Sequence, residues 1–164
     1  MPSLTFEHLH RRPEHVPTIA RWWFDEWGHE APGLTAEANE ARVRENLGAL
    51  LPVTIVALRD GRPVGVAELK AHELFDVLPE RTPWLGGVYV VPEARGEGLA
   101  ARLVGEIEAI AARAGFRRLW LDTEVPDGGL YARLGWRIDR HLEHAGLKLT
   151  VMDRLLEARD PSRT

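Results

Sequence analysis

The sequence of 164 residues contains no cysteine and only two serines, Ser3 and Ser162, near its two ends. A chain without cysteine can form neither a disulfide nor a thiol nucleophile, and these two serines are poor candidates for a covalent acyl intermediate. No apolar run is long enough to span a membrane, and the first residues lack the basic-then-apolar layout of a signal peptide. We therefore expect a cytoplasmic protein that uses no serine or cysteine nucleophile.

Lysine is also scarce, with only Lys70 and Lys148, and the formal net charge of −4 argues against nucleic acid as the main partner. The histidines and carboxylates show no spacing typical of a metal site, so no metal is expected. The length and the 45% hydrophobic content predict one globular domain over residues 1–164, with a tail from about residue 157 that frays.

The most informative segment is a glycine-containing loop between a strand and a helix. Residues 87–91 read as a strand, and Arg95-Gly96-Glu97-Gly98 follows after Pro92-Glu93-Ala94. The loop opens a helix marked by apolar residues at spacings of three and four, ending before Gly115. The start of a helix leaves several backbone N–H groups without partners, and it carries about half a positive charge. With glycines to admit a phosphate and Arg95 to supply donors, the loop predicts a diphosphate site.

This segment resembles the acetyl-CoA motif of the GNAT superfamily of N-acyltransferases, [Q/R]-x-x-G-x-[G/A], with Arg95, Gly98 and Ala100 in the defined places. A second block, Leu130-Tyr131-Ala132-Arg133-Leu134-Gly135-Trp136, resembles the family's Tyr-x-x-x-Gly-aromatic signature. The resemblance implies acetyl-CoA as cosubstrate. The residues expected to bind it are Arg95, Gly96, Glu97, Gly98, Leu99, Ala100 and Ala101.

A second interpretation of the loop is a dinucleotide fingerprint, since Gly96-x-Gly98-x-x-Ala101 fits it and Asp122 could bind a ribose. However, four residues separate the strand from the first glycine, and the preceding region reads as an antiparallel hairpin. The remaining chain is also too short for the crossovers of a dinucleotide-binding fold. The coenzyme A interpretation is therefore favoured.

The other elements follow from periodicity and turn residues. Helices are expected at 17–27, from Thr35 to about Leu50, and near 129–134. Strands are expected at 4–8, 53–58, 64–70, 83–91, 118–122, 136–143 and 147–154, with Asp60-Gly61 as a hairpin turn. The predicted fold is α/β, with a mostly antiparallel mixed sheet and one parallel β-α-β crossover. The family resemblance adds that the two central strands splay apart.

The resemblance also implies roles for backbone and side chains beyond the loop. Backbone groups of Val88 and Val90 would hold the pantetheine arm as a neighbouring strand would, with a backbone N–H near Val90 facing the thioester oxygen. Tyr131 would protonate or hydrogen-bond the sulfur. Upstream of Tyr131, Glu124 and Asp127 stand where the family commonly carries asparagine and alanine, which indicates an altered loop.

A general base for the attacking amine is less well marked. Glu68, Glu73, Asp76, Asp122 and a chain of water molecules are all open, with Glu68 our first choice because its strand adjoins the motif strand. Acceptor specificity is expected from the loop at 73–82 and from the N-terminal helices. The residues of those helices that could line an acceptor pocket are Trp22, Trp23, Asp25, Glu26, Trp27, His29 and Glu30.

Two functions remain open from the sequence. The first is transfer of an acetyl group from acetyl-CoA to a primary amine, on a small molecule or a peptide, by direct attack and without a covalent enzyme intermediate. The second is a non-catalytic sensor that binds acyl-CoA. Tyr131 favours the enzyme, since a sensor needs no acid beside the sulfur. Family resemblance also makes a homodimer common, and neither a membrane nor nucleic acid is expected as a partner.

Overall fold

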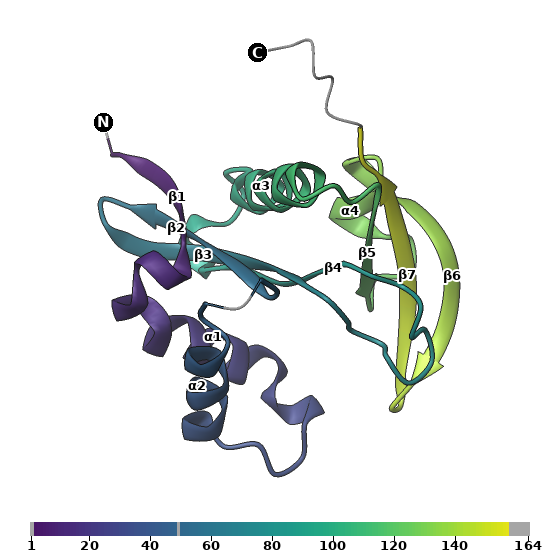
Figure 1. The fold of residues 1–164 in the computed structure, drawn as a ribbon, viewed down its shortest axis with the longest axis horizontal. Coiled ribbons are helices and arrows are strands. Elements are labelled where there is room, and N and C mark those ends of the chain that lie inside the picture. The colour runs from purple at the N-terminus through teal and green to yellow at the C-terminus, as the bar shows by residue number, and fades with distance from the viewer. Residues whose placement is uncertain (1, 49, 158–164) are drawn as a thin grey trace. The chain divides into compact units, whose positions relative to one another are not determined.

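Seven strands form one open, mixed sheet in the computed structural model, which describes residues 2–48 and 50–157. The strand order is β1-β2-β3-β4-β5-β7-β6 (Figure 1). One pair, β4 and β5, is parallel and is joined through α3, and Trp84 of β4 faces Trp120 of β5. This arrangement confirms the predicted α/β class with its single parallel crossover. The splaying of the two strands stays a prediction.

The elements, in chain order, are β1 (Leu4–His8), α1 (Val16–Trp27), α2 (Ala36–Glu45), β2 (Val53–Arg59), β3 (Arg62–Lys70), β4 (Trp84–Val90), α3 (Leu99–Arg113), β5 (Arg118–Thr123), α4 (Gly129–Arg133), β6 (Arg137–His144) and β7 (Leu147–Leu155). Short 3₁₀ turns occupy Leu9–Arg11, Pro13–His15, Gly28–Glu30 and Pro92–Ala94. Within the described ranges, no helix is both long and apolar enough to cross a membrane.

The predicted elements agree with these bounds except at the end of α2. The N-cap at Thr35 is as expected, because its hydroxyl accepts a hydrogen bond from the Ala38 N–H at 3.1 Å. The helix ends at Glu45 rather than near Leu50. Asn46 stops it by folding its side-chain amide back onto the Arg42 carbonyl at 3.0 Å, a local bond that competes with further helical turns.

The structure divides the chain into two compact units. Unit 1 comprises the described residues up to Glu68 together with Gly87–Val104, and unit 2 comprises Leu69–Gly86 together with the described residues from Gly105 onwards. The division leaves the expectation of one domain over 1–164 untested. The tail predicted to fray, apart from Glu157 itself, lies outside the described residues.

The core of unit 1 lies between its sheet strands and the helices α1 and α2. Val56, Leu58 and Val66 of β2 and β3 pack against Ile19 of α1 and Val43 of α2. The opposite side of β3 is covered by the start of α3, where Leu103 lies against Gly65. Neighbouring residues of β3 therefore serve opposite faces, as the period of two in a strand requires.

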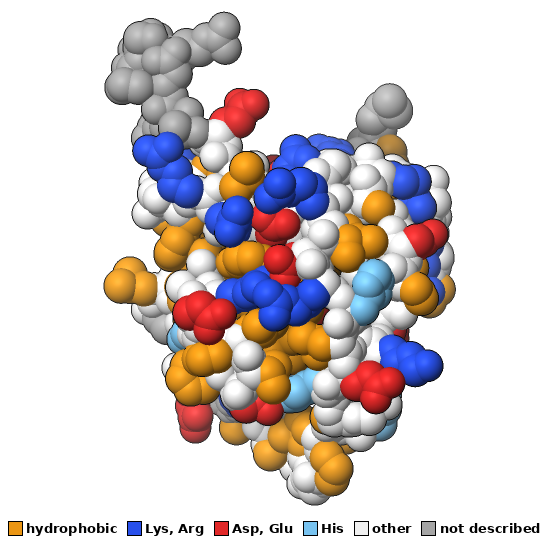
Figure 2. Space-filling model, turned by 90° about the vertical axis from the view of Figure 1, so that its right-hand side faces the viewer, with side chains coloured by type: hydrophobic (Ala, Val, Ile, Leu, Met, Phe, Trp, Pro, Cys, Tyr) orange, Lys and Arg blue, Asp and Glu red, His pale blue; other side chains and the backbone are white. Residues whose placement is uncertain are grey.

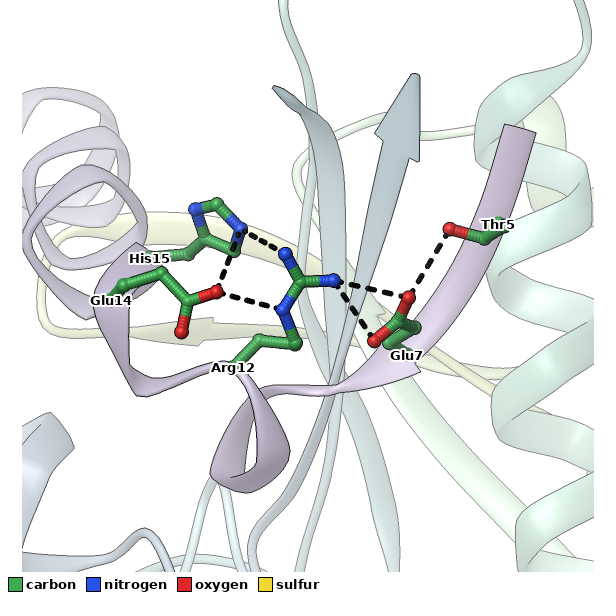
Figure 3. A network of polar contacts seen from close by, with 5 residues as sticks. All are labelled: Thr5, Glu7, Arg12, Glu14 and His15. Carbon is green, nitrogen blue, oxygen red and sulfur yellow. Dashed lines mark hydrogen bonds and ion pairs between the residues drawn. The ribbon is translucent and has the colours of Figure 1, made fainter. Parts of the chain in front are cut away.

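A charged network joins β1 to the turn that enters α1 (Figure 3). Arg12 donates to Glu7 at 3.1 Å and to Glu14 at 2.7 Å, and it also lies within 3.4 Å of His15. The bond from Arg12 holds the pKa of the Glu14 carboxyl below its usual range. Because Glu14 is exposed and the other groups are only partly buried, solvent screens the network, which orients the chain entering α1 more than it stabilises the fold.

Unit 2 has its own core around the tryptophan pair Trp84 and Trp120, with Leu78, Leu149 and Val151. Arg81 lies over the Trp120 ring at 4.1 Å and donates to Asp139 of β6 at 2.6 Å. Figure 2 looks onto the side that carries β6 and β7 in Figure 1, and shows basic and acidic side chains next to one another. That mixture leaves no large surface of one charge on this face.

Candidate active site

The loop before α3 adopts the conformation that an anion site needs. Gly96 and Gly98 have φ angles of +81° and +78°, and an added Cβ at either position would meet no atom within 4 Å. The glycines are therefore required by the backbone conformation, which side chains disfavour, rather than by crowding. The Arg102 N–H bonds to the Gly98 carbonyl at 3.2 Å. The N–H groups between Gly98 and Arg102 precede the intrahelical bonds of α3 and can serve a ligand.

Arg95 connects this loop to β4. Its Nε donates to the Val90 carbonyl at 2.9 Å, and its guanidinium lies 5.6 Å from the centre of the Tyr89 ring. The sequence predicted Arg95 as a donor to phosphate but not this bond to the backbone. With Nε engaged on β4, the two terminal nitrogens are the atoms that can reach a phosphate oxygen.

Glu97 brings a negative charge into a loop predicted to bind an anion. Its carboxylate pairs with Arg59 at the end of β2. This pairing offsets the charge of Glu97, so that the residue can contribute its backbone N–H to a diphosphate. The partner lies 38 residues away in sequence, and no sequence pattern indicated it.

The backbone of β4 presents alternate residues to opposite edges. The Val91 N–H bonds to the Val64 carbonyl at 3.0 Å, and the Tyr89 carbonyl lies on the same side, 3.2 Å from where a Cβ of Gly65 would stand. The Val90 N–H shares a peptide unit with the Tyr89 carbonyl, and the Val90 carbonyl shares one with the Val91 N–H, so both backbone groups of Val90 point away from β3. This orientation is the one that the predicted role of Val90 requires.

Two tryptophans of α1 lie against β4. The indole N–H of Trp23 donates to the Gly87 carbonyl at 2.9 Å, and the Trp22 ring stacks on Tyr89 with 5.3 Å between ring centres. Gly87 has a φ of +58°, and a Cβ there would lie 2.9 Å from the Trp23 nitrogen. The sequence predicted these tryptophans as walls of an acceptor pocket, and the contact with the β4 backbone was missed because it requires the tertiary fold.

The acidic residues predicted near α1 are largely paired within their own segment. Asp25 pairs with Arg21 at 3.0 Å, and Glu30 lies 4.0 Å from His29. In each pair at least one side chain is exposed to solvent, which is typical of a solvated helix face. A role for these carboxylates in attracting an amine stays a prediction.

Tyr131 lies in α4 of unit 2 and is partly buried. Burial, together with the charge of Asp122, raises its pKa to about 12. The ring meets that of Trp136 edge to face, with 6.2 Å between centres. A tyrosine with a raised pKa keeps its proton at neutral pH, so this hydroxyl is suited to donate a hydrogen bond or a proton.

Glycines fix α4 against β7 at both of its ends. Gly128 has a φ of +82°, and a Cβ there would lie 2.6 Å from Cε of the buried Met152. Gly135 has a φ of +93°, and Arg154 donates to the neighbouring Leu134 carbonyl at 2.8 Å. Asp127, which departs from the family pattern, accepts a bond from the Gly129 N–H at 3.0 Å and so holds the turn that leads into α4.

Several candidates for the general base already have partners. Glu73 pairs with Lys70, and Asp76 accepts from His144 at 2.8 Å, which holds the pKa of the Asp76 carboxyl below its usual range. Glu68 is partly buried on β3. It shares the face of Val66, two residues earlier, which packs in the core formed with α1 and α2. Glu68 therefore lies on the side of the sheet that α1 covers, where it also has an interaction of its own, and its role as the general base stays a prediction.

Comparison with known proteins shows the family of this chain. The model of the acetyltransferase (GNAT) family matches residues 16–136. The chain belongs to the GNAT family. It is therefore an acetyl-CoA-dependent N-acetyltransferase, and the resemblance seen in the two sequence motifs is confirmed.

One relative and two solved structures illustrate the similarity. An uncharacterized N-acetyltransferase of Mycobacterium bovis is 31% identical over 114 residues, which are 68% of this chain and 69% of that protein. The yncA protein of Salmonella typhimurium, solved with its cofactor acetyl-CoA, superimposes with a TM-score of 0.73 at 20% identity, over 98% of this chain and 99% of that one. An aminoglycoside 6′-N-acetyltransferase complexed with coenzyme A superimposes with a TM-score of 0.74 at 15% identity, over 95% of this chain and 99% of that one. At such identities the two structures support the fold of this GNAT protein.

Proposed function

We infer that this GNAT protein transfers an acetyl group from acetyl-CoA to a primary amine by direct attack, without a covalent enzyme intermediate. The observation that carries the proposal is the loop at the start of α3. Two glycines with positive φ flank Glu97 there, and the site of each missing Cβ faces open space. The N–H groups of residues 96–101 and the terminal nitrogens of Arg95 hold the diphosphate of the cofactor.

The backbone of β4 orients the reacting group. The N–H groups of Val88 and Val90 bind the pantetheine arm and the thioester oxygen, where negative charge develops as the amine attacks. The carbonyl of Val90 is already engaged by Arg95. The N–H of the same residue is the donor that we propose for the thioester oxygen.

The proton and electron balance uses two further residues. The neutral amine forms a bond to the carbonyl carbon, and the amine proton passes to Glu68, directly or through water. As the C–S bond breaks, its electron pair leaves with sulfur, and Tyr131 supplies the proton that makes free coenzyme A. Solvent then takes the proton from Glu68 and returns one to Tyr131, whose raised pKa favours the protonated form.

Thermal unfolding with CoA and acetyl-CoA tests cofactor binding. At a ligand concentration of one hundred times Kd, the stabilisation is about 2.7 kcal/mol, which raises the Tm by roughly 5 to 10 °C for a chain of this size. An unchanged Tm with both ligands would refute the cofactor site. A panel of amines with detection of the released thiol then separates the enzyme from a sensor, which would bind both ligands and release no thiol.

The role of Tyr131 is tested with Tyr131→Phe. We expect kcat to fall about 100-fold or more because the leaving thiolate loses its proton donor, while the affinity for CoA changes little. Tyr89→Phe is the matched control, since Tyr89 is the chain's other tyrosine and the variant keeps its ring against Trp22. Equal turnover in the two variants would remove Tyr131 from the mechanism.

A further inference from the structure

The hydrogen bond between Trp23 and Gly87 lies next to Val88, which is proposed to bind the pantetheine arm. The Gly87 carbonyl accepts from the Trp23 indole at 2.9 Å, although Gly87 lies within β4, where carbonyls ordinarily bond to neighbouring strands. Its φ of +58° turns the peptide unit out of regular strand geometry. A helix side chain therefore binds the strand backbone at this point.

The same contact sets the direction of a second group. The Gly87 carbonyl and the Val88 N–H belong to one planar, trans peptide unit, so the two groups point in opposite directions. Fixing the carbonyl on Trp23 fixes the Val88 N–H pointing away from α1. Neither group can turn without breaking the indole bond.

Gly87 and Trp23 are also matched in shape. An added Cβ at Gly87 would stand 2.9 to 3.0 Å from three atoms of the indole ring. The ring thus occupies the space that any other residue at position 87 would fill. Trp23 is partly buried and packs against the core formed by α1, α2 and β3, which limits the movement of the ring.

We propose that Trp23 is a positioning residue for the cofactor: through the Gly87 carbonyl it aims the Val88 N–H, and thereby controls how tightly the pantetheine arm binds. The inference rests on the proposed function, in which Val88 receives that arm. Trp23 touches neither the cofactor nor the reacting atoms in this role. It acts through the strand.

Trp23→Phe tests the inference because phenylalanine keeps an aromatic ring and loses the N–H. We expect the affinity for CoA to fall roughly tenfold, the value of one oriented hydrogen bond. The affinity for 3′-phospho-ADP, which has the phosphates and lacks the pantetheine arm, should change less than about twofold. Trp22→Phe is the matched control, since Trp22 is the neighbouring tryptophan on α1 and contacts the Tyr89 ring rather than the β4 backbone.

The outcomes are distinct in calorimetric titrations of the wild type and both variants. The inference is supported if Trp23→Phe loses affinity for CoA but not for 3′-phospho-ADP, and if Trp22→Phe keeps its affinity for both. Equal losses for CoA and 3′-phospho-ADP, or none for either, overturn it and leave the proposed function standing. If the wild type binds neither ligand, the proposed function itself fails and the inference fails with it.

A second measurement needs no substitution. In ¹⁵N-labelled wild-type protein, CoA should shift the Trp23 indole resonance, because the arm binds the other end of the same peptide unit. Addition of 3′-phospho-ADP should leave that resonance in place. An indole resonance that responds to neither ligand, or equally to both, contradicts the inference.

Discussion

Tyr131 illustrates how its surroundings can prepare one side chain for chemistry. Its pKa of about 12 arises first from burial and second from the nearby charge of Asp122. Both effects disfavour the tyrosinate, so the hydroxyl keeps its proton at neutral pH, as the proposed role requires. The family motif identified Tyr131 from the sequence, whereas the shift of its pKa depends on residues that only folding brings near it.

This shift predicts how stability depends on pH. An unperturbed tyrosine titrates near pH 10, so between about pH 10 and 12 the unfolded chain loses a proton that the folded protein keeps. The free energy of unfolding should therefore fall as pH rises through that window, by roughly 1 kcal/mol per pH unit from this group. Below about pH 10 the group is protonated in both states, so it adds nothing to the pH dependence of the free energy of unfolding. Urea unfolding at pH 9, 10 and 11 measures the slope. Tyr131→Phe should flatten it, and an unchanged slope would contradict the effect of burial.

At the scale of elements, α3 is preceded by one glycine and contains another, and the two differ in backbone conformation. Gly98 has a φ of +78° at the helix entry, whereas Gly105 lies exposed inside the helix without a positive φ, and an added Cβ at either would meet no atom within 4 Å. Space therefore does not distinguish the two positions. Only the backbone conformation does, and it predicts opposite effects for the same substitution.

Gly98→Ala should cost about 1 kcal/mol of stability, because alanine is strained at positive φ, and should weaken CoA binding by distorting the N–H groups of the loop. Gly105→Ala should instead stabilise the protein by about 1 kcal/mol, through better helix propensity, and leave CoA binding intact. Chemical denaturation and titration with CoA measure both effects. Stabilisation by Gly98→Ala would show that the loop does not need its left-handed residue.

The sequence predicted elements well where local signals are strong. Asp60-Gly61 gave the β2–β3 turn, and both residues have positive φ, at 50° and 79°. The end of α2 was placed too late because Asn46 ends the helix through its own side chain, an interaction that propensity does not capture. The short α4 was expected, but the glycine contacts that hold it on β7 were not.

At the scale of the whole molecule, neither unit is a continuous piece of chain. β4 passes from unit 2 into unit 1 between Gly86 and Gly87, and α3 passes back between Val104 and Gly105. β3 likewise passes from unit 1 into unit 2 between Glu68 and Leu69, so two strands and a helix are shared by both units. Melting one unit would unravel part of an element that the other requires.

Unfolding should accordingly be one cooperative transition, as the prediction of a single domain over 1–164 requires. Differential scanning calorimetry measures this as equal calorimetric and van't Hoff enthalpies. Two separable peaks, or a calorimetric enthalpy well above the van't Hoff value, would mean that the two units behave as separate domains.

The sequence by itself determined the order of the elements, and it predicted the diphosphate loop and the role of Tyr131, because each depends on residues that are close together in the chain. Tertiary structure alone decided which partners meet: Arg59 on Glu97, Arg95 on the Val90 carbonyl and Trp23 on Gly87. The last of these joins residues 64 positions apart. Such contacts follow from packing of whole elements, and packing leaves no local periodicity in a sequence.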